Sequence, residues 1–139
     1  MYISTNSDQD LAINNNKLIK FEKAQNEDEE LPKEILSYKN IWYVGSASGC
    51  SCSFRHLMTP DLGFSEPVDW YEEDGEDIEA TKQLYDVLKK VLEKGKQVEI
   101  VDKWTQVESK DIKEMEISLS EINRNEFRFI ENYKFILKD

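Results

Sequence analysis

The residues best suited to chemistry lie in one short segment, Gly49-Cys50-Ser51-Cys52-Ser53-Phe54-Arg55-His56. It holds both cysteines of the chain and its single histidine. Cys50, Cys52 and His56 offer the sulfur and imidazole ligands that zinc prefers, with Asp, Glu or water as a fourth. The spacing disfavours zinc, because zinc sites usually place two or more residues between paired cysteines. We therefore expect no cofactor, with zinc as the alternative.

The same two cysteines can act as a redox pair. A Cys-x-Cys pair can close a small, strained disulfide that is easily reduced. Arg55 or His56 nearby would lower the pKa of a thiol and make it more reactive. A Cys–His hydrolase fits less well, because His56 is the sole histidine and no residue that would orient it is evident.

A structural role for the cysteines is the interpretation that the sequence favours. A free cysteine behaves as a small buried hydrophobe. If residues 50–54 are extended, Cys50, Cys52 and Phe54 all point to one face, which is the period of a half-buried strand. In this interpretation both thiols stay reduced and carry out no reaction.

A second candidate site is acidic, because seven of the eleven residues 69–79 are Asp or Glu. Carboxylates at this density can gather Ca²⁺ or Mg²⁺, but the segment lacks the spacing of an EF-hand loop. It is also typical of the solvated start of a helix, where negative charge is favourable. Trp70 and Tyr71 beside the acids are candidate anchors for a basic partner, and the alternative is that they cover a hydrophobic core. The candidate partner-binding residues are Trp70, Tyr71, Glu72, Glu73, Asp74, Glu76 and Asp77.

The element that must position both segments is a helix, which we expect over residues 77–94. Its apolar residues recur at helical spacing, and Gly95 is suited to end it. Alternating and β-branched runs predict strands near residues 17–23, 41–45, 97–104 and 115–119, and a C-terminal hairpin of 127–129 with 133–137. Strands on both sides of one helix, without a βαβα rhythm, favour an α+β fold with a mostly antiparallel sheet. We expect a single domain over residues 1–139, with loosely ordered polar residues 1–16 and a short β segment that could start at Tyr2.

Composition excludes several classes of protein. The chain has 139 residues, 29 of them acidic and 18 basic, for a net charge of −11. This balance argues against binding nucleic acid or anionic membranes, both of which need clustered Lys and Arg. The longest strongly apolar run, residues 41–44, is far short of the about 20 residues of a membrane span. No signal peptide is evident, so the expected location is the cytoplasm.

The negative charge is concentrated in two places. Residues 27–30 contribute four acids and residues 69–79 contribute seven, with no base in either segment. The other 18 acids equal the 18 bases in number. The sequence therefore predicts a charge-balanced domain that carries two acidic loops.

One set of motifs resembles small bacterial proteins of an uncharacterised family. The set comprises Gly49-Cys50-x-Cys52-x-Phe54, the helix that ends at Gly95, Val98-Glu99-Ile100, Trp104, Phe127, Phe129 and Tyr133. The resemblance covers roughly residues 40–137. This chain has Ser51 and Ser53 where the family pattern would have small residues, often glycine. The resemblance implies no activity and no functional residues.

We therefore expect a non-enzymatic protein-interaction module, immunity-like or regulatory, whose acidic loops bind a basic protein. This expectation rests on an analogy of size and charge with toxin-antagonising immunity proteins. The alternative is a metal- or thiol-dependent activity centred on Cys50, Cys52 and His56.

Overall fold

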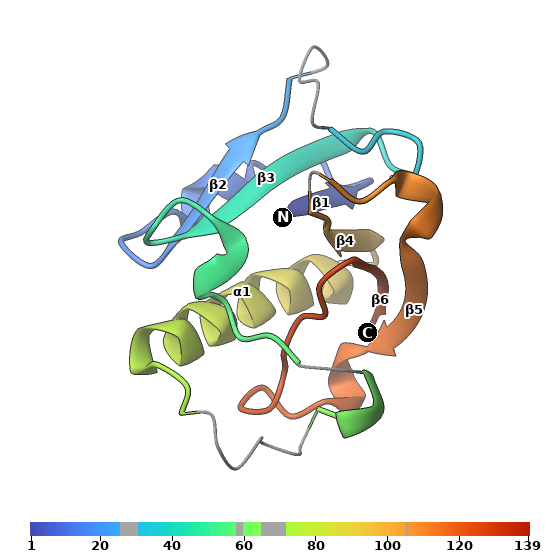
Figure 1. Cartoon of the computed structure of the whole chain (residues 1–139). Helices are drawn as coiled ribbons and strands as arrows, with labels where there is room; N and C mark the ends of the chain where they lie inside the picture. The colour runs from blue at the N-terminus through green and yellow to red at the C-terminus, as the bar shows by residue number, and fades with distance from the viewer. Residues whose placement is uncertain (26–30, 58–59, 65–71, 105) are drawn as a thin grey trace.

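One long helix packs against a six-stranded sheet in the part of the chain that the structure describes (Figure 1). This computed structural model describes residues 1–25, 31–57, 60–64, 72–104 and 106–139. The elements are β1 (Tyr2–Thr5), β2 (Ile19–Lys23), β3 (Asn40–Ser46), α1 (Gly75–Glu93), β4 (Val98–Asp102), β5 (Lys113–Ser118) and β6 (Tyr133–Lys138). The sheet order is β2-β3-β1-β4-β6-β5, and all neighbours are antiparallel except β5 and β6. The predicted single α+β domain with a mostly antiparallel sheet is confirmed.

Helix α1 confirms the strongest pattern in the sequence and begins two residues earlier than expected. The Asp74 carboxylate caps it by accepting a hydrogen bond from the backbone N–H of Glu76 at 2.8 Å. Gly95 has a φ of 74°, and the next residue, Lys96, donates its N–H to the carbonyl of Val91. This Schellman arrangement ends the helix, because glycine adopts the left-handed conformation without steric cost.

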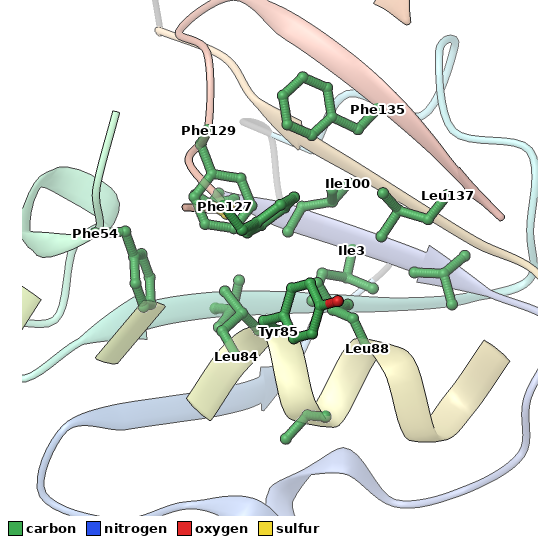
Figure 2. Packing of buried hydrophobic residues seen from close by; sticks show 14 of the residues in the cluster. Ile3, Phe54, Leu84, Tyr85, Leu88, Ile100, Phe127, Phe129, Phe135 and Leu137 are labelled. Carbon is green, nitrogen blue, oxygen red and sulfur yellow. The ribbon is translucent and has the colours of Figure 1, made fainter. Parts of the chain in front are cut away.

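The core lies between α1 and the sheet. Figure 2 shows Leu84 and Leu88 of the helix pointing toward aromatic residues that precede and enter β6. Phe127 and Phe129 are in edge-to-face contact, with ring centroids 5.0 Å apart. Tyr85 joins this cluster and donates its buried hydroxyl to the carbonyl of Leu119 at 2.6 Å. The aromatic residues thus fill the space beneath the sheet without leaving the Tyr85 hydroxyl unpaired.

On the opposite face of the sheet, a buried carboxylate of β4 attaches a neighbouring loop segment to the strands. Glu99 is 3% exposed, and its carboxylate accepts hydrogen bonds from the hydroxyls of Ser4 and Ser37. The buried Lys134 ammonium lies 3.5 Å from the same carboxylate and donates to the carbonyl of Ile35. Because every member of this group has a partner, it fastens residues 35–37 to the sheet.

The predicted C-terminal hairpin is wrong. Strand β6 pairs with β4 on one side and β5 on the other, so residues 127–129 are not its partner. Phe129 instead forms an isolated parallel bridge with His56. Asn132, with a φ of 62°, turns the chain into β6 and donates its N–H to the carbonyl of Asp102. Alternation along a strand identifies its buried face, but it does not identify its neighbour.

The start of the chain is also better ordered than expected. Strand β1 lies at the centre of the sheet between β3 and β4, and Ile3 is completely buried. Residues 11–14 form a 3₁₀ turn capped by Asp10. The short β segment predicted at Tyr2 is confirmed, whereas loose order over residues 1–16 is not.

No helix in the described ranges is both long enough and apolar enough to cross a bilayer.

Gly45 of β3 provides a test of how closely the next segment, residues 47–53, packs against this strand; we call this segment the cysteine loop. A Cβ at this position would lie 2.9 Å from the backbone carbonyl carbon and oxygen of Gly49. We expect Gly45→Ala to displace this loop and to lower the free energy of unfolding by about 1–3 kcal/mol, measured by urea denaturation. The control is Gly75→Ala, because a Cβ there meets open space at the first residue of α1. Equal losses of stability in both variants would contradict the close contact.

Candidate functional site

The cysteine loop begins where β3 ends and folds back on that strand. Gly49, with a φ of 82°, donates its N–H to the carbonyl of Ser46, and Ser46 donates its N–H to the carbonyl of Cys50. The Tyr43 hydroxyl also donates to the carbonyl of Gly49, at 2.9 Å. Glycine is suited to this reversal because it accepts positive φ. These hydrogen bonds, with one from the Ser46 hydroxyl to the carbonyl of Cys50, hold the loop against β3.

Cys50 and Cys52 are joined by a disulfide, and this corrects the expectation of buried, reduced thiols in an extended strand. Residues 51–53 form a 3₁₀ turn, Cys52 is exposed and Cys50 is half-buried. The turn competes with a strand because small polar residues hydrogen-bond locally. Ser48 is an example, since its hydroxyl lies 3.1 Å from that of Ser53.

His56 forms a partly buried ion pair with Asp102 at the end of β4. Its Nε2 lies 2.7 Å from Oδ2 of Asp102, and its Nδ1 lies 2.8 Å from the carbonyl oxygen of Phe54. Both partners accept hydrogen bonds, so only the doubly protonated imidazolium satisfies them together. Burial lowers the pKa of His56, but the hydrogen bond to Asp102 and its negative charge outweigh burial and raise the pKa above the usual value. In this state His56 offers no lone pair to a metal or a proton.

Asp102 is the member of this group that sequence reasoning did not identify as functional. Burial favours its neutral form, yet the hydrogen bond and positive charge of His56 lower its pKa. The Ser51 hydroxyl, between the two cysteines, donates to the other carboxylate oxygen at 2.9 Å. The sequence did hold one signal for Asp102, because it is an acid on the apolar face of a predicted strand. A buried charge there requires a partner.

The three proposed zinc ligands do not form a metal site. Both sulfurs belong to the disulfide, and both nitrogens of His56 have oxygen partners. Within the described ranges, no group of three or more His, Cys, Asp or Glu side chains is placed to hold a metal ion. The geometry therefore supports the disulfide as the chemical feature of the cysteine loop.

Glu73 is a structural residue and leaves the predicted set of partner-binding residues. Its carboxylate makes two hydrogen bonds with Arg55, at 2.7 and 2.9 Å, and two with Arg128, at 2.7 and 3.3 Å. Both arginines are 7% exposed. The hydrogen bonds from Arg55, followed by those from Arg128, lower the pKa of Glu73 to about 2 against the opposing effect of burial. A carboxylate held in this way is not available to a partner.

The remaining acids at the start of α1 do face solvent. Glu72, Asp74 and Glu76 are exposed, and Asp77 is half-buried. Burial, followed by the negative charges of Asp74, Glu76 and Glu73, raises the pKa of Asp77. Among the described residues, no cation forms an ion pair with these four carboxylates. The predicted anchors Trp70 and Tyr71 lie outside the described residues.

Hollows surround both the acids and the disulfide. Asp77 lines two of them, one of about 150 Å³ that it shares with Glu76 and one of about 200 Å³ that it shares with Cys52. A larger cleft of about 570 Å³ lies on the other side of the loop, and its lining includes Cys50, Asp102 and the 46% exposed Trp104. The sequence pattern did not predict these hollows, which form between segments distant in the chain.

Comparison with protein-family models, with curated proteins and with solved structures gave no match. The resemblance to an uncharacterised bacterial family therefore stays a prediction, and the site is interpreted from its own geometry.

We call the ion pairs of Glu73 with Arg55 and Arg128 the Glu73 clamp. It predicts that the free energy of unfolding falls at low pH. We expect Glu73→Gln to lower the free energy of unfolding by about 3 kcal/mol at pH 7, because it leaves two buried guanidinium groups without a counter-charge. Since the pKa of Glu73 is lowered in the folded state, its contribution exists above the unfolded value and disappears as the pH falls from about 5 to about 2. Urea denaturation of both proteins across this range measures the difference.

The matched control for this prediction is Glu72→Gln, the exposed neighbour. Its stability should stay within about 0.5 kcal/mol of the wild type. A similar small effect at Glu73 would show that the clamp does not stabilise the fold.

The His56–Asp102 pair predicts an unusual titration. Because the chain has one histidine, its imidazole C–H signals can be followed by NMR without assignment. We expect a pKa above the usual value of about 6.5, and a lower pKa in Asp102→Asn. The pair should stabilise the fold fully below that usual value and lose its effect as the pH rises through the folded-state pKa. Asp86→Asn, which affects an exposed pair with Arg124, should leave the His56 titration unchanged.

Proposed function

We propose that this chain is a non-enzymatic interaction domain that binds a basic protein through Glu72, Asp74, Glu76 and Asp77. The proposal rests on the surroundings of Asp77. Burial, followed by the negative charges of neighbouring carboxylates, makes the ionised form of Asp77 less favourable and raises its pKa. The positive charge of His56 opposes this increase only in part, so a cation from a basic partner placed beside Asp77 would relieve the remaining repulsion.

The shape of the surface supports the same partner chemistry. Asp77 stands at the edge of two hollows, and Glu76 lines one of them. A lysine or arginine side chain that entered the hollow of about 150 Å³ would place its charge against the carboxylates of Glu76 and Asp77, where ion pairs are stronger than in open water. The other hollow is less suited to a cation, because Arg55 and His56 line it. The exposed Glu72 and Asp74 would then add long-range attraction and speed association.

A domain of this kind acts by covering a basic surface of its partner, which suits an immunity-like or regulatory role. We place this role in the cytoplasm, because two cysteines with a single residue between them do not make the disulfide framework of a secreted domain. Nucleic acid and membranes are not the proposed partners, since the proposed surface is negatively charged.

The experiment tests whether binding depends on the position of these acidic residues or only on the net charge of the domain. One variant combines Glu72→Gln, Asp74→Asn, Glu76→Gln and Asp77→Asn. The matched control removes four exposed acids elsewhere, with Glu22→Gln, Asp61→Asn, Glu93→Gln and Glu121→Gln. Both variants carry a net charge of −7, against −11 for the wild type.

Binding of a fluorescent lysine- and arginine-rich peptide is measured by anisotropy at low and at physiological salt. We expect the wild type to bind with an affinity that falls with salt, the first variant to bind at least tenfold more weakly, and the control to stay within about threefold. Equal losses in both variants would show attraction to net charge alone. Absence of binding by the wild type, or binding that is unaffected in the first variant, would overturn the proposal.

A further inference from the structure

We infer that Cys50 and Cys52 form a reversible disulfide–dithiol site that exchanges with an external dithiol, with Cys52 as the sulfur that is attacked and Cys50 as the leaving sulfur. This inference is independent of the proposed binding of a basic protein. It rests on the access to the two sulfurs, on the donors around them, and on the bonds that hold the loop without the disulfide.

Access distinguishes the two cysteines. Cys52 is exposed and opens onto the hollow of about 200 Å³, whereas Cys50 is half-buried at the wall of the larger cleft. Thiol–disulfide exchange requires a thiolate to approach one sulfur directly, and the more exposed residue, Cys52, offers that approach. This places the mixed disulfide on Cys52.

Hydrogen-bond donors favour Cys50 as the leaving sulfur. Its Sγ accepts a hydrogen bond from the backbone N–H of Cys52 at 3.3 Å. The Ser48 hydroxyl lies 3.5 Å from the sulfur of Cys50 and 3.9 Å from that of Cys52. Donors close to a sulfur stabilise the negative charge that it gains when the bond breaks, and a stabilised thiolate leaves faster.

The loop does not need the disulfide in order to keep its shape. A bridge between residues two apart closes a very short loop, so it removes little freedom from the unfolded chain. Separate hydrogen bonds already fix both sides, from the N–H and hydroxyl of Ser46 to the carbonyl of Cys50, and from the Ser51 hydroxyl to Asp102. The bond can therefore open and close while the fold persists.

The exchange balances without any other reactant. A thiolate of the external dithiol forms a bond to Sγ of Cys52, and the Cys50–Cys52 bond breaks with its electron pair on Cys50, which takes a proton. The second thiol of the dithiol then attacks the other sulfur of the dithiol, which is bound to Cys52 in the mixed disulfide. This attack releases Cys52 as a thiol. Two electrons and two protons pass from the dithiol to the protein, and a disulfide substrate reverses the sequence.

The first experiment equilibrates the folded wild type with mixtures of reduced and oxidised dithiothreitol, followed by alkylation and mass spectrometry. We expect a reversible two-thiol transition, with unchanged circular dichroism in both forms. Reduction that occurs only when the protein unfolds, or failure of the reduced protein to re-form the bond, would overturn the inference.

The second experiment tests the roles of the two sulfurs. The oxidised wild type is treated with the neutral monothiol 2-mercaptoethanol, the mixed disulfide is trapped by alkylation of the released thiol, and its position is found by fragmentation of the peptide in mass spectrometry. We expect at least five times as much mixed disulfide on Cys52, with the alkyl group on Cys50. Equal amounts on the two sulfurs, or more on Cys50, would overturn the assignment of Cys52 as the attacked sulfur.

A third variant tests the donor at the leaving sulfur. Ser48→Ala should slow reduction of the wild-type disulfide by dithiothreitol about threefold to tenfold, because it removes the hydroxyl nearest Cys50. The control Ser120→Ala alters an exposed serine that bonds to Ser118, far along the chain, and should leave the rate unchanged. An unchanged rate in Ser48→Ala would show that this hydroxyl does not assist the exchange.

Discussion

The carboxylate of Glu73 joins three distant parts of the chain, and the arrangement of the site depends on it. It lies just before α1 and binds Arg55, which follows the cysteine loop, and Arg128, which precedes β6. Two buried guanidinium groups would be strongly unfavourable alone, so each requires this counter-charge. The backbone continues the connection, because Phe129 donates its N–H to the carbonyl of Arg55 at 2.8 Å. One ionised side chain thereby fixes the exit of the cysteine loop against the core.

A second ionised side chain fixes the other end of the loop. Asp102 binds His56 and Ser51 at once, so the loop is held from the end of β4 as well as from the start of α1. Both carboxylates are stabilised by cations from the same short segment, residues 55–56. The arginine and histidine that follow the cysteines therefore serve as counter-ions within the fold, rather than as groups that activate a thiol.

Local patterns in the sequence predicted the elements, whereas contacts between them had to be observed. Apolar spacing, an acidic cap and Gly95 suffice to define α1, because each acts within a few residues. The alternation of apolar and polar residues along β6 does not identify the strands that pair with it, so the hairpin prediction was wrong. The Cys-x-Cys spacing fits a strand as well as a turn, and only the bonds to β3 and Asp102 decide between them. Glu73 and Asp77 are both acids of one segment, yet their roles differ because two arginines from elsewhere reach only Glu73.

The two proposed sites meet at a single hollow. Cys52 and Asp77 both line the cavity of about 200 Å³, together with the carboxylates of Glu73 and Glu131 and the cationic side chains of Arg55 and His56. Glu73 is paired with Arg55 and Arg128, so the acids of this hollow are balanced by neighbouring cations. A partner that bound at Asp77 and reached into this hollow would cover Cys52 and hinder an incoming dithiol. Binding of a partner and exchange at Cys52 would therefore compete for the same space, and an occupied surface would protect the disulfide.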